Sequence, residues 1–84
     1  MTIQEYEEKL LQLIDDGIDT ATDDELFAGG YLRGHISLAA AECELENKSQ
    51  LSAMKEKVEQ SIADAKSELS PSDYELICAF WKQL

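Results

Sequence analysis

One short stretch of this 84-residue chain, positions 23–35, holds most of the side chains that could bind or react. It contains the only arginine, Arg33, the only histidine, His35, and three of the four glycines. It opens on Asp23 and Asp24, and Tyr31 lies between the glycines. Histidine commonly transfers protons near neutral pH, and arginine and tyrosine are frequent anchors of protein interfaces. This stretch therefore holds the first candidates for a functional site.

Catalysis by His35 would require a nucleophile or a second side chain that orients the imidazole. Tyr31 and Glu42 lie on nearby faces of the predicted helix, and Cys43 or Cys78 could approach in three dimensions. No spacing demands such a site, and a lone histidine on an apolar helical face is usually a neutral, hydrogen-bonded imidazole. We therefore expect a chain that is not an enzyme, with His35 as a weak functional candidate.

Arg33 lies outside the apolar face of the same helix, and two roles are open to it. In so acidic a chain we expect a local ion pair, with Glu44 or Asp16 as the partner. An exposed pair of this kind contributes little to stability. The alternative is that Arg33 anchors a partner protein, as arginines at the centres of interfaces do.

The glycines of this stretch need a physical reason, because a glycine inside a helix costs up to about 1 kcal/mol relative to alanine. Gly30, Gly34 and Ala41 fall along one side of the helical wheel, a small-residue pattern that lets two backbones approach closely. We expect this side to pack against the first or the third helix of the chain. A groove for a partner and a break of the helix at Gly29–Gly30 are the alternatives.

The sequence predicts no metal site and no cofactor. The acidic run from Asp15 to Glu25 suggests calcium, but an EF-hand loop needs a glutamate at its twelfth position. A loop that starts at Asp15 has Leu26 there, and one that starts at Asp19 has Gly30. Zinc would have one histidine and two distant cysteines as ligands, and no glycine motif for phosphates or dinucleotides is present.

The elements that must position these side chains are helical. Apolar residues make up 44% of the chain, too many for a disordered acidic tail, and they recur at helical spacing with no alternating strand pattern. Helix starts carry capping signals at Thr2 with Glu5, at Thr22 with Glu25, and at Ser70 before Pro71 and Asp73. The third start is less clear, with Ser49 or Ser52 as its cap.

These signals predict helices over about 3–18, 23–46, 51–69 and 71–83. Their short connections favour antiparallel neighbours. We therefore expect a single domain, 1–84, of the all-α class, a compact four-helix bundle-like fold. The last helix is apolar over an arc of about 200°, wider than one core-facing stripe requires. Either other helices enclose it, or part of the arc is an interface, which makes Trp81 a second candidate anchor.

The charge of the chain is strongly negative and unevenly distributed. Eighteen acidic residues stand against 7 basic ones, a formal net charge of −11. Residues 1–46 hold 12 acidic and 2 basic side chains, so nearly all of the excess lies in the first half. This balance excludes ordinary binding to a nucleic-acid backbone, which requires a basic face. It favours a basic protein partner, or a mimic of nucleic-acid charge that occupies a basic nucleic-acid-binding protein.

Further features of the sequence indicate a bacterial cytoplasm. The first residues lack the basic and apolar regions of a signal peptide, and the longest apolar run, Leu76–Trp81, is far too short to span a membrane. Cys43 and Cys78 are too few for a disulfide framework and are expected to be reduced, with a bridge between them as the alternative. We therefore expect a cytoplasmic protein without membrane contact.

Two segments of the stretch 23–35 read Asp-Asp-Glu-Leu-Phe-Ala at 23–28 and Gly-Tyr-Leu-Arg-Gly-His at 30–35. They resemble the signature of the YfcL-like family of small proteobacterial proteins. Leu-Ile-Asp at 13–15 and Glu-Leu-Ser-Pro at 68–71 also fit. The resemblance implies an all-helical fold in a bacterial cytoplasm. It implies no activity and brings no catalytic residue to this chain.

The sequence as a whole predicts a non-catalytic protein-interaction module, with a homodimer as one form that it can take. The alternatives are the charge mimic and an enzyme that uses His35. The predicted partner surface lies on the glycine-rich helix and includes one residue of the last helix. Its members are Asp23, Asp24, Gly30, Tyr31, Arg33, Gly34 and Trp81.

Overall fold

Side-chain caps determine where three of the four helices begin. In the computed structural model, which describes residues 1–84, the Thr2 hydroxyl accepts a hydrogen bond from the Glu5 N–H at 3.1 Å. The Glu5 carboxylate accepts one from the Thr2 N–H at 2.8 Å. Thr22 and Glu25 form the same reciprocal pair, at 3.2 and 3.0 Å, and Ser70 caps the last helix. The three predicted caps are confirmed, and each satisfies backbone donors that a helix start leaves free.

The chain forms four α-helices and two short 3₁₀ turns, without a strand, which confirms the predicted all-α four-helix class. The helices are α1 (Ile3–Asp16), α2 (Asp23–Leu45), α3 (Leu51–Asp64) and α4 (Pro71–Gln83), and the turns are η1 (Ile18–Thr20) and η2 (Lys66–Glu68). No helix is both long and apolar enough to cross a membrane. Cys43 is buried and Cys78 half-buried, and both are free thiols.

Two helices end earlier than predicted, and one begins differently. α1 ends before residue 18, because the chain turns at Gly17 into η1. α3 ends at Asp64 instead of near residue 69, and η2 follows it. The predicted cap of α3 at Ser49 or Ser52 is wrong, because Gln50 is the N-cap residue and its side chain makes no capping hydrogen bond. A start without a cap leaves no clear signal in the sequence.

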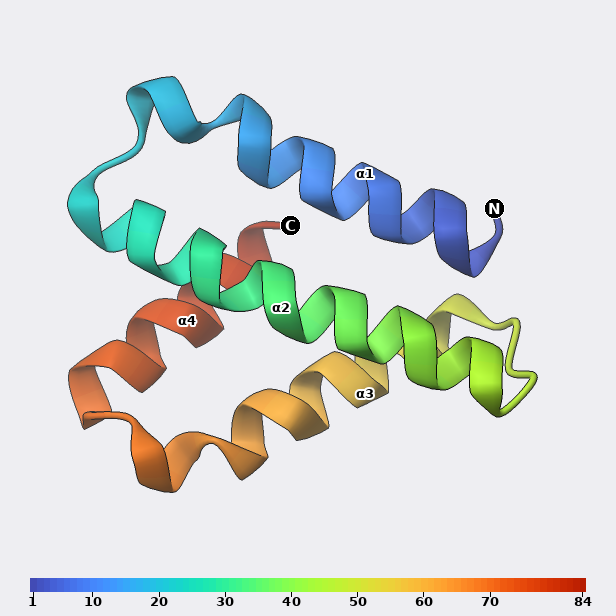
Figure 1. Ribbon diagram of the computed structural model, residues 1–84. Coiled ribbons are helices and arrows are strands. Elements are labelled where there is room, and N and C mark those ends of the chain that lie inside the picture. Colours follow the sequence, from blue (N-terminus) through green and yellow to red (C-terminus); the bar gives the residue numbers. More distant parts are fainter.

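α2 is the helix on which the other three pack. α1, α3 and α4 each make their most extensive contact with α2, and they contact one another much less. Figure 1 shows α2 in front, with α1 and α3 on either side of it and α4 behind. The result is a flat molecule of 36 × 30 × 16 Å. The buried residues of α2 are Ala28, Gly29, Leu32, Ile36, Ala39, Ala40 and Cys43.

α4 does not occupy the enclosed position that its wide apolar arc allowed. Ile77 is its only fully buried residue, whereas Leu76, Phe80 and Trp81 are half-buried. The central position belongs to α2, whose many small core residues let three helices approach it. The arc of α4 therefore leaves apolar surface partly uncovered at the helix junctions.

Gly29 is the glycine that allows helices to approach closely. It is buried, and a Cβ at this position would lie 3.0 Å from Cγ2 of Ile14 on α1 and 3.5 Å from Cζ of Phe80 on α4. A contact of 3.0 Å is too short for an ordinary side chain at position 29, so the absence of one lets α1 and α4 meet α2 here.

The predicted packing of Gly30, Gly34 and Ala41 against another helix of the chain is wrong. All three residues are exposed, and no atom lies within 4 Å of the place that a Cβ of Gly30 or Gly34 would take. α2 also continues without a break through Gly29–Gly30. The side of α2 that carries these small residues faces solvent, opposite the core.

We expect Gly30→Ala to raise the free energy of unfolding by about 0.5–1 kcal/mol, because alanine favours a helix and its methyl group meets open space. Gly29→Ala gains the same helix preference but must displace the buried Ile14, and overpacking of this kind costs about 1–3 kcal/mol. Urea unfolding at low protein concentration measures both variants. Equal stabilisation by the two substitutions would contradict the close contact at Gly29.

Candidate binding pocket

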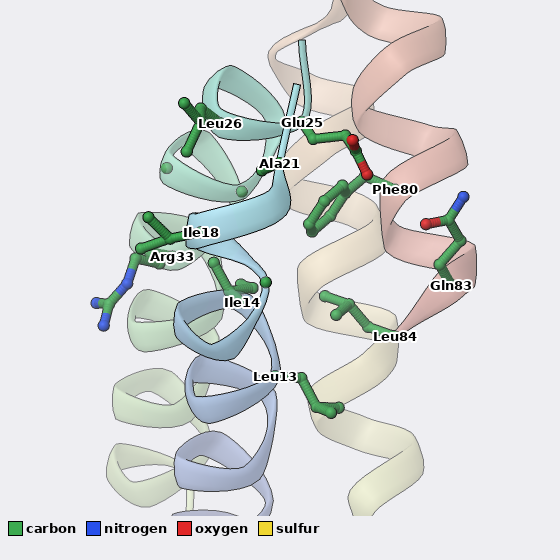
Figure 2. A pocket seen from close by; sticks show the side chains of 13 residues that line it. Leu13, Ile14, Ile18, Ala21, Glu25, Leu26, Arg33, Phe80, Gln83 and Leu84 are labelled. Atoms are coloured by element: carbon green, nitrogen blue, oxygen red, sulfur yellow. The ribbon is translucent and has the colours of Figure 1, made fainter. Parts of the chain in front are cut away.

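An apolar pocket of about 310 Å³ opens where α1, η1, α2 and α4 meet. Figure 2 shows Leu13 and Leu84 facing each other at one end, and Phe80 beside Glu25 at the other. The apolar side chains that line it are Leu13, Ile14, Ile18, Ala21, Leu26, Phe80 and Leu84, and the polar ones are Glu25, Arg33 and Gln83. This volume is at the lower end of the range typical of ligand pockets, roughly 300–1,000 Å³. An apolar lining with few polar groups suits an apolar side chain or a small apolar ligand.

Glycines in the lining make room for the pocket. Gly17, Gly29 and Gly30 all line it. At Gly29 the side chains of α1 and α4 touch α2, whereas one residue further, at Gly30, no atom comes within 4 Å of the Cβ position. The helices therefore meet at one point of α2 and leave a hollow directly beside it.

Arg33 joins α2 to the end of α1 through two hydrogen bonds to one carboxylate. Its Nε donates to Asp15 Oδ1 at 3.0 Å, and its Nη2 donates to Oδ2 at 2.8 Å. These hydrogen bonds lower the pKa of Asp15 below its ordinary 3.8 and raise the pKa of Arg33. The predicted partners are wrong, because the Glu44 and Asp16 carboxylates accept hydrogen bonds from glutamine side chains instead. The pair fixes the position of α1 along the wall of the pocket.

The segment 15–25, which contributes Gly17, Ile18, Ala21 and Glu25 to the pocket, is rich in carboxylates, and only one of these has a cationic partner. Residues 15–25 contain six acidic side chains and no lysine or arginine. Asp15 is bound by Arg33, and none of the other five forms an ion pair. Those five are Asp16, Asp19, Asp23, Asp24 and Glu25. The apolar hollow thus lies within a strongly negative part of the surface.

Four residues of the predicted partner surface lie at or beside the pocket. Gly30 and Arg33 line it directly. Asp23 and Asp24 lie in the first turn of α2 next to Glu25, another lining residue, and Asp24 also borders a smaller hollow against α4. The acidic first turn of α2 and Gly30 therefore both lie at the pocket.

The other predicted residues lie elsewhere. Gly34 is exposed on the outer face of α2, where Tyr31 is half-buried against the rings of Phe27 and His35. Trp81 lines a shallow hollow with Tyr6, away from Gly30 and Arg33. The predicted surface is thus divided among the pocket, the outer face of α2 and the separate hollow that Trp81 lines.

His35 is half-buried and makes a contact between α2 and α3. Its Nδ1 hydrogen-bonds the hydroxyl of Ser61, and its ring centroid lies 4.6 Å from that of Tyr31. Burial lowers the pKa of His35 below its ordinary 6.5, so the imidazole is neutral at pH 7. His35 lines neither the large pocket nor the three smaller hollows around α4. These contacts favour a structural role for His35, between α2 and α3.

Sequence reasoning does not identify the apolar side of the pocket. Leu13 belongs to the apolar stripe of α1, which Ile18 in η1 continues, and Phe80 and Leu84 belong to the arc of α4, so all four resemble core residues. Yet Leu13 and Ile18 are 44% and 48% exposed. The one signal in the sequence is that both apolar faces are larger than a single core contact requires.

The fold is that of a small helical protein built around one glycine-containing central helix. The chain matches the family model described as YfcL protein over residues 4–84, and it belongs to the YfcL family. A relative from Escherichia coli (strain K12), uncharacterized protein YfcL, is 46% identical over 84 residues, which are 98% of this chain and 91% of that protein. No solved structure matches the chain. The family resemblance found in the stretch 23–35 is confirmed.

We expect the Asp15 carboxyl to titrate below its ordinary pKa of 3.8 and to return toward that value in Arg33→Ala. Because the pKa is lowered in the folded state, the pair stabilises the fold fully above pH 3.8, and this contribution is lost as the pH falls through the lowered pKa. A carbon-detected NMR titration measures the carboxyl directly. Arg33→Lys is the control, because it keeps the charge without the two parallel hydrogen bonds. An unshifted Asp15 in the unchanged protein would contradict the pair.

We expect stability to decline as the pH is lowered below about 6.5, because the unfolded chain then binds a proton that the folded state resists at His35. The decline ends below the lowered folded-state pKa. His35→Asn, whose amide takes the place of Nδ1 and can still hydrogen-bond Ser61, is expected to remove it. Chemical unfolding between about pH 7.5 and 5.5 makes the comparison above the range in which most carboxylates titrate. The same decline in both proteins would assign it to another group.

Proposed function

We propose that this protein is a non-catalytic interaction module of the bacterial cytoplasm whose pocket takes an apolar side chain of a basic partner protein. The observation that carries the proposal is the apolar hollow of about 310 Å³ within a stretch of carboxylates that are mostly without a cation. Binding energy at protein interfaces is concentrated in apolar anchors that fill pockets. Charges around such a pocket select the partner and speed its approach.

The charge distribution supports a basic partner. Five carboxylates of residues 15–25 have no ion pair, and the chain as a whole carries a net charge of −11. A protein with lysine or arginine beside its apolar anchor would be attracted over a distance limited by salt screening. Nucleic acid and anionic membrane surfaces would be repelled. The complex is therefore expected to weaken as salt is added.

The contacts of Arg33 fit a role in positioning the pocket wall better than a role in binding the partner directly. The Nε–Nη2 edge of its guanidinium already donates two hydrogen bonds to Asp15, at 3.0 and 2.8 Å. This contact holds the end of α1 against α2, where Leu13 and Ile14 form part of the pocket wall. Arg33 is thus proposed to position the wall that receives the partner.

The polar groups of the pocket support a non-catalytic role. Its titratable side chains are Glu25 and Arg33. Glu25 is bound within the capping box at the start of α2, and Arg33 is paired with Asp15. His35, on which the enzyme alternative depends, hydrogen-bonds Ser61 outside the pocket. Neither lining group is thus poised to take a proton from a bound molecule.

We expect the double variant Leu13→Asn, Ile18→Asn to reduce capture of a basic partner by roughly tenfold or more, since two apolar contacts are removed. Both residues are about half exposed, so the fold should persist. The control is Ala63→Asn, an exposed position on α3 that lies outside the pocket. Quantitative affinity purification from lysate of the source bacterium, at about 50 and 500 mM salt, compares the three proteins.

The outcomes separate this proposal from the charge mimic. Loss of the partner in the pocket variant, retention in the control and weakening by salt are expected. Full retention in the pocket variant with a steep loss in high salt would favour a charge mimic that uses the carboxylates alone. A complex that salt does not weaken would contradict a basic partner.

A further inference from the structure

α2 carries a regular apolar row on the face opposite the core. Its members follow one another at spacings of 4, 3, 4, 3 and 4 residues. This is the spacing of the contact positions in a coiled coil. They are Phe27, Tyr31, Gly34, Leu38, Ala41 and Leu45, and we call them the outer seam.

The outer seam is uncovered in the single chain. Phe27, Leu38 and Leu45 are 41%, 51% and 84% exposed, whereas Leu32 and Ile36 on the other side of the helix are fully buried. In Figure 1, α1 and α3 lie on either side of α2 and α4 lies behind it, so that no helix covers the front of α2. A contiguous exposed apolar row along a whole helix is a mark of an interface.

The outer seam also lies in the longest stretch of the chain without a carboxylate. Residues 26–41 contain no aspartate or glutamate, and their one charged side chain, Arg33, is bound to Asp15. The whole chain has 18 acidic residues. A second molecule of the same net charge is repelled by α1 and by the ends of α2, and it is repelled least along this row.

We propose that the outer seam binds the outer seam of a second copy of the chain, with the two α2 helices antiparallel. The facing pairs are then Phe27 with Leu45, Tyr31 with Ala41, and Gly34 with Leu38. Two-fold symmetry repeats each pair. In two of the three pairs a large side chain meets a small one or none, so that side chains of one helix fill the spaces of the other.

Two parallel α2 helices would not place large side chains opposite small ones. They would place Gly34 against Gly34 and Ala41 against Ala41, and gaps would remain between the large side chains.

The area of the seam sets the expected strength of the dimer. In this register the two α2 helices overlap from Phe27 to Leu45. A strip about 28 Å long and about 12 Å wide covers roughly 340 Å² of each copy. The total of roughly 700 Å² is below the 1,200–2,000 Å² typical of stable complexes. We therefore expect a reversible dimer with a dissociation constant in the micromolar range.

This dimer goes beyond the proposed function, because the outer seam and the pocket share no residue. The effect of salt distinguishes the dimer from the complex with a basic partner. Screening of the −11 charges of both copies strengthens the dimer, whereas it weakens a complex with a basic partner. Failure of one proposal therefore leaves the other standing.

Sedimentation equilibrium over micromolar to millimolar concentration tests the dimer. The mass of the unchanged protein is expected to rise from 9.4 kDa toward twice that value. Gly34→Glu and Leu38→Glu are expected to weaken the dimer by about 100-fold or more. Both positions are exposed, so the fold should be retained, and Ala63→Glu, exposed on α3, is the matched control. A monomer at all concentrations, or a dimer that both seam variants leave unchanged, would overturn the proposal.

Disulfide trapping tests the antiparallel direction, in a background with the half-buried Cys78 replaced by alanine. Phe27→Cys and Leu45→Cys proteins, mixed and oxidised, are expected to form a disulfide with each other. Neither is expected to link to itself, because like positions would lie roughly 27 Å apart in antiparallel helices. Links between like positions, or equal linking of all pairs, would overturn the antiparallel arrangement.

Discussion

Where α1 and α4 reach α2, they meet at Gly29, the one buried position of the central helix that has no side chain. Ile14 would lie 3.0 Å from a Cβ there, and Phe80 3.5 Å. This contact brings both helices close to α2, and the hollow beside it, above Gly30, becomes the pocket. The Arg33–Asp15 pair then fixes α1 along the same wall. Packing and the candidate site thus have a common origin in two adjacent glycines.

Helix capping made much of the fold predictable. The Thr2, Thr22 and Ser70 caps each rely on a side chain within three residues, so local sequence is sufficient to place them. The packing between helices was harder to predict from the sequence. Helical periodicity identified Gly30 and Gly34 as unusual, but it could not show which glycine faces a neighbouring helix. That depends on how the helices are rotated about their axes, which is set by contacts between residues far apart in the chain.

The candidate site, too, was predictable where local sequence is informative and unpredictable where distant residues meet. Sequence patterns marked the stretch 23–35 and its arginine, because residue types alone are informative there. The partner of Arg33 is Asp15, 18 positions away, and the apolar wall combines α1 with α4. Neither follows from local spacing. The carboxylates are concentrated beside the apolar pocket, whereas the outer face of α2 is free of them.

The central claim is that the pocket receives an apolar side chain from a basic partner. The most direct measurement is an amide NMR titration of the labelled protein with a short helical peptide rich in leucine and lysine. Gly17, Gly29 and Gly30 line the pocket, whereas Gly34 does not. We expect saturable shifts at the first three glycines and little change at Gly34. Shifts confined to Gly34, or shifts at none of the four, would contradict it.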